Sequence, residues 1–332
     1  MRLSAAALVL ASSLAPLALA QTAPAPPEAA PAPAASPAPV EAVDLGSPVV
    51  EALEVVAQPP GPALWKVTKG NSEVVVLGAV KPVAHSLVWD TVRLDRALDG
   101  AKILLVEPKL KLGLFDVVRF KIGGKRVDQP GALSEAKLPA RLRERFVAAR
   151  IASHQEARRY EGMKTYVAAF LLVNDYREAA GLSGAKPDST VEKLAAAHRV
   201  KVQPVSEYGL GSAVKQAGPI SEAVGLACLD DSVDQVRQES DHAQALGKAW
   251  AAGDLKTVKA LYAPPPLERC LQQVPNVAVI ERGTEDNTRA ILNALRTPGK
   301  AVAVVDLNFL LRPNGVLDRL KAQGAAVSVP AG

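Results

Sequence analysis

The sequence has few of the residues that usually bind transition metals. Its 332 residues include only 2 cysteines and 4 histidines. The histidines are scattered, at positions 85, 154, 198 and 242, which argues against a site of three histidine ligands. The cysteines, Cys228 and Cys270, have no histidine beside them, which argues against a zinc site of mixed cysteine and histidine ligands.

The sequence also lacks a concentrated charge of one sign. It has 39 lysines and arginines and 34 acidic residues, for a formal net charge of +5. Binding nucleic acid as a main role requires a dense basic surface, so we expect no nucleic-acid partner. The arginines between Arg141 and Arg159 are spread around a predicted helix and indicate a solvated face.

A signal-like hydrophobic run occurs only at the N-terminus. The segment "MRLSAAALVLASSLAPLALA" has one basic residue, an apolar stretch and the small-residue pattern Ala18-Leu19-Ala20. This pattern predicts a secretory signal peptide over residues 1–20, cleaved near Ala20. No later run is long enough to cross a membrane. We therefore expect a periplasmic or secreted protein with no transmembrane segment after cleavage.

Two further expectations follow from composition and compartment. Residues 21–62 are dominated by proline and alanine, a composition that predicts a disordered, polyproline-like linker. In an oxidising compartment the pair Cys228 and Cys270 is expected to form a disulfide, with free thiols as the alternative.

The remaining residues, 63–330, alternate between strand and helix patterns. The pattern predicts a hairpin of strands 64–68 and 73–77, buried strands at 101–108, 200–205 and in "KAVAVVDLNFL", and a last strand in "AAVSVP". A helical insertion is predicted at about 114–185, a second helical region at about 209–263, and a helix over 284–296. The fold class is therefore α/β: a central mixed sheet flanked by helices, with the insertion between its N- and C-terminal halves.

Several short motifs occur in a characteristic order. They are "ALWKV", "VVVLGAVK", "ILLVEP", "VIERGTEDNTRAIL", "VAVVDLN" and "NGVLDRLKAQGAAVSV". In order and spacing they resemble the TraB/GumN family (the TraB–PrgY–GumN–Tiki group) over residues 63–330. For active members such as the Tiki proteases, the resemblance implies a metal-dependent hydrolase. Two histidines of Gly-x-x-His motifs and a strand-end glutamate would then surround a divalent Mn, Co or Zn ion.

The first motif and the glutamate can be placed directly. Lys81 stands where the first histidine is expected, three residues after Gly78. A protonated lysine has no lone pair, so it cannot bind a metal. Glu107 matches the strand-end glutamate, and Arg282 matches an arginine that the family carries before a helix.

The second motif can be aligned in two ways. Anchored on "VAVV", it places Asn308 at the histidine; anchored on Gly315, it places Phe309 there and Asp306 at the glycine. No histidine is present in either case. A glutamate that the family often has after the middle strand is Ser206 here, or Glu207 after a slip of one residue.

Two interpretations of Lys81 and Glu107 remain. In one, the lysine forms a salt bridge that replaces the metal, with Arg282 able to share the carboxylate. In the other, Lys81 is a catalytic base whose pKa is lowered by burial. We expect the salt bridge, because it preserves the charge balance of the site. The candidate catalytic residues are Glu107, Arg282 and Lys81, and the candidate cleft residues are Gly78, His85, Asn308, Asp306, Ser206 and Glu207.

The expected function follows from the resemblance and the missing ligands. We expect an exported TraB/GumN-like protein without metal or other cofactor, acting as a binding or scaffold protein for a peptide or another envelope ligand. One alternative is a Tiki-like hydrolase or protease with an altered active site, which would bring back a need for Mn, Co or Zn. Another is a carrier of haem or a small ligand.

Overall fold

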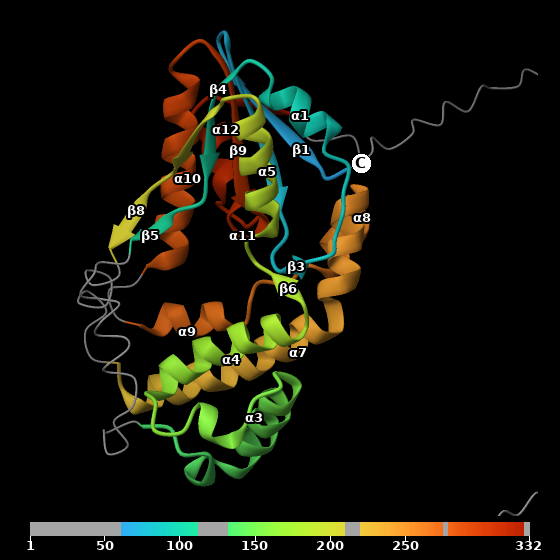
Figure 1. Ribbon diagram of the computed structural model, residues 1–332. Coiled ribbons are helices and arrows are strands. Elements are labelled where there is room, and N and C mark those ends of the chain that lie inside the picture. Colours follow the sequence, from blue (N-terminus) through green and yellow to red (C-terminus); the bar gives the residue numbers. More distant parts are fainter. Residues whose placement is uncertain (1–60, 112–131, 210–219, 275–277, 329–332) are drawn as a thin grey trace, which may run out of the picture. The chain divides into compact units, whose positions relative to one another are not determined.

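The computed structural model describes residues 61–111, 132–209, 220–274 and 278–328 (Figure 1). The predicted signal peptide and nearly all of the predicted linker lie outside these residues. Residues 114–131 of the predicted insertion and residues 210–219 of the second helical region also lie outside them.

The core of the fold is a six-stranded mixed sheet with the strand order β10-β1-β2-β9-β4-β7. β1 pairs antiparallel with β10 and β2, whereas β2, β9, β4 and β7 run parallel to one another. This confirms the predicted α/β class with a mixed sheet. The strands are β1 (Leu64–Lys69), β2 (Ser72–Ala79), β4 (Ala101–Val106), β7 (Lys201–Pro204), β9 (Gly299–Asp306) and β10 (Ala326–Ser328).

Two short pairs of strands extend the structure beyond the sheet. β3 (Val83–Ala84) pairs antiparallel with β6 (Leu182–Ser183), and β5 (Lys109–Lys111) pairs parallel with β8 (Glu207–Gly209). β5 follows β4 along the chain and β8 follows β7. This pair therefore extends the β4–β7 side of the sheet beyond the ends of those two strands.

Helices cover both faces of the sheet (Figure 1). α1 (Val92–Leu98) and α5 (Lys186–Ala197) pack on one face, and α10 (Val279–Leu295), α11 (Leu307–Leu310) and α12 (Val316–Ala322) pack on the other. The sheet strands are strongly apolar because both faces are covered. Val67, Val74, Val76, Val302 and Val304 are fully buried.

A second hydrophobic cluster lies among the helices drawn below the sheet in Figure 1. These are α3 (Ala140–Ala152), α4 (Thr165–Ala179), α7 (Glu222–Ala252) and α9 (Leu267–Gln273). The C-terminal part of α7 reaches the sheet, where Trp250 Nε1 donates to the Gly78 carbonyl at 2.7 Å. The remaining elements are α8 (Leu255–Leu261) and the 3-10 helices η1 (Glu135–Lys137) and η2 (Ala157–Arg159).

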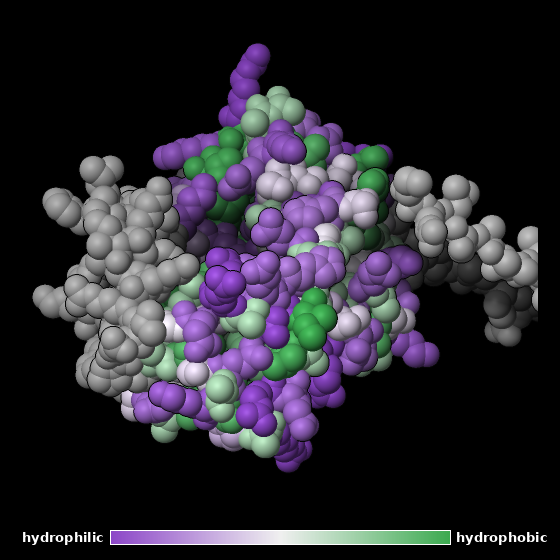
Figure 2. All heavy atoms as spheres, turned by 60° about the horizontal axis from the view of Figure 1, so that its bottom comes forward, coloured by the Kyte–Doolittle hydropathy of each residue, from purple (hydrophilic) through white to green (hydrophobic). Residues whose placement is uncertain are grey.

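The surface turned forward in Figure 2 is mainly hydrophilic, with smaller hydrophobic patches between the polar residues. Arg141 and Arg143 are exposed on α3, as expected for a solvated helix face. The expectation is wrong for Arg145 and Arg150, which are partly buried and pair with Asp234 and Glu135. Arg159 is exposed but also pairs with a carboxylate, that of Asp175. Within the described ranges, no helix has both the length and the apolar character that crossing a membrane requires.

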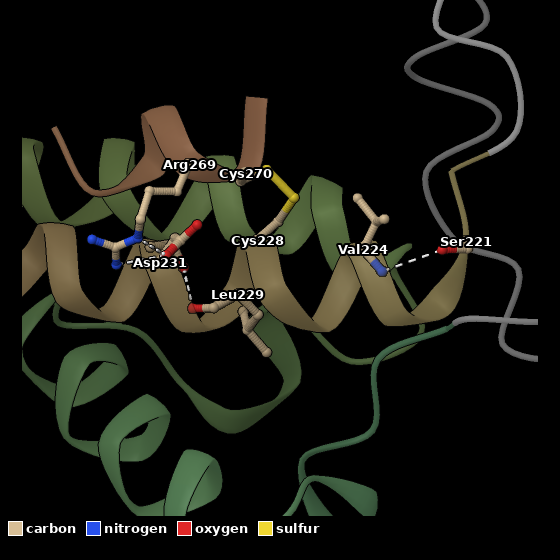
Figure 3. The surroundings of a disulfide bond; sticks show 8 residues. Ser221, Val224, Cys228, Leu229, Asp231, Arg269 and Cys270 are labelled. Carbon is tan, nitrogen blue, oxygen red and sulfur yellow. Dashed lines mark hydrogen bonds and ion pairs between the residues drawn. A yellow bond between two sulfur atoms is a disulfide. The ribbon is translucent and has the colours of Figure 1, made fainter. Parts of the chain in front are cut away.

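A disulfide joins the two cysteines, as predicted. Cys228 on α7 and Cys270 on α9 are both fully buried, and their sulfur atoms are 1.98 Å apart. On the same side of α9, Arg269 donates to Asp231 at 2.8 Å (Figure 3). The short helix α9 is therefore held on α7 by both a covalent bond and an ion pair.

Two predicted boundaries are wrong. α10 begins at Val279, five residues before the expected start at 284, and "LNFL" forms α11 instead of continuing the strand. A short apolar run fits a buried strand and a buried helix equally well. In the structure, the Asp306 side chain accepts the Asn308 backbone N–H at 2.7 Å, which ends β9 and caps the helical turn.

Candidate functional site

The parallel strands bring the predicted site residues to one edge of the sheet. β2, β9, β4 and β7 all end at this edge because they run in the same direction. Lys81 follows β2, Glu107 follows β4, and Asp306 is the last residue of β9. Helices α5 and α10 begin near this edge because they precede β7 and β9. The carboxyl ends of parallel strands are the usual ligand-binding edge of α/β sheets.

Lys81 lies between two carboxylates. Its Nζ is 2.7 Å from Glu107 Oε2, and it also forms an ion pair with Asp188 in the first turn of α5. The side chains of Lys81, Glu107 and Asp188 are 13%, 30% and 16% exposed. The ion pair between Lys81 and Glu107 that the sequence predicted is therefore present, with a third member added.

The charges keep Lys81 protonated. Burial alone would lower the pKa of Lys81, but the charges of Glu107 and Asp188 outweigh it, so the pKa is raised. An amine with a raised pKa is a poor base at neutral pH. The geometry and the charges therefore favour the salt-bridge interpretation over the catalytic-base interpretation.

Two carboxyl groups at this edge, those of Glu107 and Asp306, have raised pKa values. Burial raises the pKa of Glu107, and the charge of Asp188 adds to this effect while Lys81 opposes it. Burial and the charge of Glu107 raise the pKa of Asp306 to about 7. One ammonium thus faces three carboxyl groups, and Asp306 holds its proton up to neutral pH.

Asp188 is the member that the sequence did not predict as a site residue. An acidic residue in the first turn of a helix is common because it stabilises the helix dipole, so it carries no functional signal by itself. The topology could have indicated Asp188 as a site residue. A helix that leads into a parallel strand begins at the carboxyl edge of the sheet, where Lys81 and Glu107 were already expected.

The strand register supports one of the two alignments of the second motif. Gly78 of β2 pairs with Val305 of β9, and the alignment that puts Val305 at the glycine puts Asn308 three positions later, as Lys81 is three positions after Gly78. Phe309 instead packs on α10, where a Cβ at Gly283 would lie 2.8 Å from its ring. This contact also explains why a glycine follows Arg282.

Asn308 contacts the helical part of the fold. It is buried, and its Nδ2 donates to Glu268 of α9 at 2.9 Å. Arg312 donates to the other oxygen of the same carboxylate at 2.8 Å. Asn308 and Arg312 therefore join the segment that follows β9 to α9.

Two predicted residues lie apart from Lys81. Arg282 is exposed, and its guanidinium carbon lies 5.8 Å from the centre of the Tyr208 ring; among the described residues it forms no ion pair with Glu107. His85 is also exposed, and its backbone N–H donates to the Gly181 carbonyl at 2.8 Å.

The remaining candidates shape the edge. Ser206 is partly buried, and its carbonyl accepts the Lys109 N–H at 3.0 Å, whereas Glu207 is exposed on β8. Gly78 is required for packing, since a Cβ there would lie 2.6 Å from both Trp65 and Leu307.

The residues at this edge do not fit the divalent metal that the resemblance implies. Lys81 offers hydrogen-bond donors and a positive charge where a ligand with a lone pair is needed. Asn308 gives its amide to Glu268. In the part of the chain that the structure describes, no group of three or more His, Cys, Asp or Glu side chains could hold a metal ion.

Comparison with known proteins gave one match. A family model described as the TraB/PrgY/gumN family matches residues 63–329, which is nearly the whole segment that carries the motifs. No curated protein and no solved structure matches the chain.

Proposed function

The chain belongs to the TraB/PrgY/gumN family, and from this premise we propose that it is a metal-free member that acts as an exported binding protein of the cell envelope. The observation that carries the proposal is the position of Lys81, with its Nζ 2.7 Å from Glu107 and a second ion pair to Asp188. The fixed ammonium supplies the positive charge that a metal would bring to these carboxylates.

A binding role suits the edge better than a metal-dependent reaction. The cation is part of the side chain, so a divalent ion approaching Glu107 would be repelled by a unit charge at close range. Glu107 Oε1 and Asp188 Oδ1 are buried and have no hydrogen-bond partner among the described residues. A peptide or another envelope ligand that opens this edge would find two unused acceptors there.

Metal content and hydrolysis test the proposal together. The full chain, purified from the periplasm of an expression host, is analysed for metals and assayed for peptide hydrolysis with and without added Mn, Co or Zn. We expect no stoichiometric metal and no metal-dependent hydrolysis. Stoichiometric metal, or activity that a chelator abolishes, would overturn the proposal.

A double substitution tests the alignment of Lys81 and Asn308 with the two family histidines. Lys81→His with Asn308→His places one imidazole after β2, beside Glu107, and one after β9. We expect this variant to bind Zn or Co, whereas Lys66→His with Asn308→His, which places one histidine far from the edge, should not. Equal metal binding by both variants would contradict the alignment.

A second candidate function is a hydrolase of altered mechanism. Asp306, whose pKa is raised to about 7, beside Glu107 provides an acid and a base that need no metal. This candidate requires peptide hydrolysis that persists in a chelator and is lost in both Lys81→Ala and Asp306→Asn. Failure to detect such activity leaves the binding role as the function of the site.

A further inference from the structure

A pocket opens behind Asn308, on the helical side of the edge. Its volume is about 260 Å³, and its walls come from α4, α9, α10 and α11. The wall residues are mainly apolar and include Phe170, Val173, Leu267, Leu271, Ile280 and Phe309. An engineered apolar cavity of roughly 150 Å³ accepts benzene, so by proportion this pocket has room for about ten non-hydrogen atoms.

The polar groups at the base of the pocket are already paired with one another. Glu268 accepts from Asn308 at 2.9 Å and from Arg312 at 2.8 Å. Gln235 donates to Glu239 at 2.7 Å. A ligand that enters this pocket therefore gains from apolar contact, because the base offers few unused hydrogen bonds.

The mouth of the pocket, unlike its base, has polar groups that can bind a ligand. Asn174 and Arg177 lie three residues apart on α4, and both line the pocket. Asn174 is exposed, and the Arg177 side chain is 29% exposed. Arg177 bonds Glu239 through Nε and Nη2, so its charge is already paired and its Nη1 group is available as a hydrogen-bond donor. An amide and a guanidinium together suit a carboxylate.

We propose that this pocket binds a medium-chain carboxylic acid, with the hydrocarbon chain among the apolar walls and the carboxylate at Asn174 and Arg177. The inference rests on the proposed binding role and names a ligand class for it. Burial of the chain supplies the affinity, since each buried methylene contributes about 0.8 kcal/mol. The mouth supplies the preference for an anionic head group.

Calorimetric titration of the full chain with octanoate, octanol and octylamine tests this proposal, because the three probes share one hydrocarbon chain. We expect saturable octanoate binding with a Kd below about 1 mM, weaker binding of octanol and the weakest binding of octylamine. No saturable octanoate binding would overturn the proposal, and so would octylamine binding as tight as octanoate.

Variants locate the binding. Val173→Phe fills the pocket from α4 and Leu271→Phe fills it from α9, and each should weaken octanoate binding about tenfold or more. Val167→Phe, on α4 but outside the pocket, should leave the Kd within about twofold. Circular dichroism confirms that each variant is folded. Octanoate binding that is equal in Val173→Phe, Leu271→Phe and Val167→Phe would place the ligand elsewhere and overturn the proposal.

The head group has its own test. Asn174→Asp puts a negative charge at the mouth, where it also competes for the Arg177 Nη1 group, and it should weaken octanoate about threefold or more while leaving octanol unchanged. An equal effect on both probes would contradict the assigned head-group site. A protein that contains metal yet binds octanoate would overturn the proposed metal-free function and leave this pocket inference intact.

Discussion

At the scale of single residues, Lys81 determines what the edge of the sheet can do. A metal ion can leave, exchange or bind a water molecule, whereas an ammonium on a side chain is permanent. Removing one member of a buried ion pair costs much more than the pair itself contributes, because an uncompensated charge is left behind. Lys81 is therefore expected to be important for folding as well as for ligand binding.

Lys81→Met should lower the free energy of unfolding by about 3 kcal/mol at neutral pH. Glu107 and Asp188 would then lie close together without a counter-charge. The loss should shrink as the pH falls below neutral, because the raised pKa of Glu107 favours its protonation. Urea unfolding over a series of pH values measures the effect. The control is Lys66→Met, because the Lys66 side chain is 55% exposed in its ion pair with Glu73, and it should cost less than about 1 kcal/mol.

Asp306→Asn should change how stability depends on pH. The folded pKa of Asp306, about 7, lies above its ordinary value of 3.8. Between these values the folded state binds more protons than the unfolded state, so stability falls as pH rises from about 4 to about 7. The amide removes this loss while its oxygen can still accept the Asn308 N–H, so the variant should be more stable by about 4 kcal/mol at pH 8 and unchanged near pH 4.

The matched control is Asp318→Asn, an exposed carboxylate in α12. It should leave the slope of stability against pH unchanged. An unchanged slope in Asp306→Asn as well would show that Asp306 is not the group that titrates at this edge.

At this scale the sequence predicted the ion pair of Lys81 with Glu107 but not the addition of Asp188. Lys81, Glu107 and Asp306 could be expected together because each follows or ends a parallel strand. Arg282 could not be excluded, because nothing local shows that its side chain stacks on Tyr208. The sequence left Asn308 and Phe309 as alternatives, and the pairing of Gly78 with Val305 favours Asn308.

At the scale of elements, β2 is shaped by close packing at its end. A Cβ at Gly78 would lie 2.6 Å from Trp65 and Leu307, so the glycine of the first motif serves the core. Gly78→Ala should therefore destabilise the fold by about 2 kcal/mol through overpacking. Gly184→Ala is the control, because nothing lies within 4 Å of a Cβ there. Thermal unfolding of the two variants measures the difference, and equal melting temperatures would contradict this role.

The disulfide is expected to stabilise the helical elements. Cys228 and Cys270 are separated by 42 positions, and closing a loop of this size in the unfolded chain contributes about 4 kcal/mol. The double variant Cys228→Ala with Cys270→Ala should lose this amount in urea unfolding, and dithiothreitol should have no further effect on it. A wild-type protein as stable in dithiothreitol as without it would argue against the bond.

The sequence predicted the order of the elements better than their ends. Alternating apolar patterns placed the hairpin and the central strands, because these strands are covered on both faces. The start of α10 and the turn of α11 were missed because "VAVI" and "LNFL" are apolar runs without a local stop signal. In each case tertiary contacts decided the boundary, such as the Asp306 cap after β9.

At the scale of the whole molecule, export remains a prediction from residues 1–20. Expression of the full chain in a Gram-negative host should yield a periplasmic protein whose N-terminus is Gln21, because the Ala18-Leu19-Ala20 pattern suits signal peptidase. Fractionation and N-terminal sequencing measure this outcome. A variant without residues 2–20 should stay in the cytoplasm. Recovery of the full chain with Met1 intact in the periplasm would contradict the cleavage.

The place of β9 in the sheet sets the timing of folding. β9 lies between β2 and β4, yet it is made more than two hundred residues after β2. Until residues 299–306 leave the ribosome, β2 and β4 have no strand between them to pair with. Pairing of strands that are far apart in the sequence, such as β2 and β9, is intrinsically slow. A chain that cannot complete its core early stays unfolded during synthesis, which is the state in which a secretion channel can thread it through a membrane.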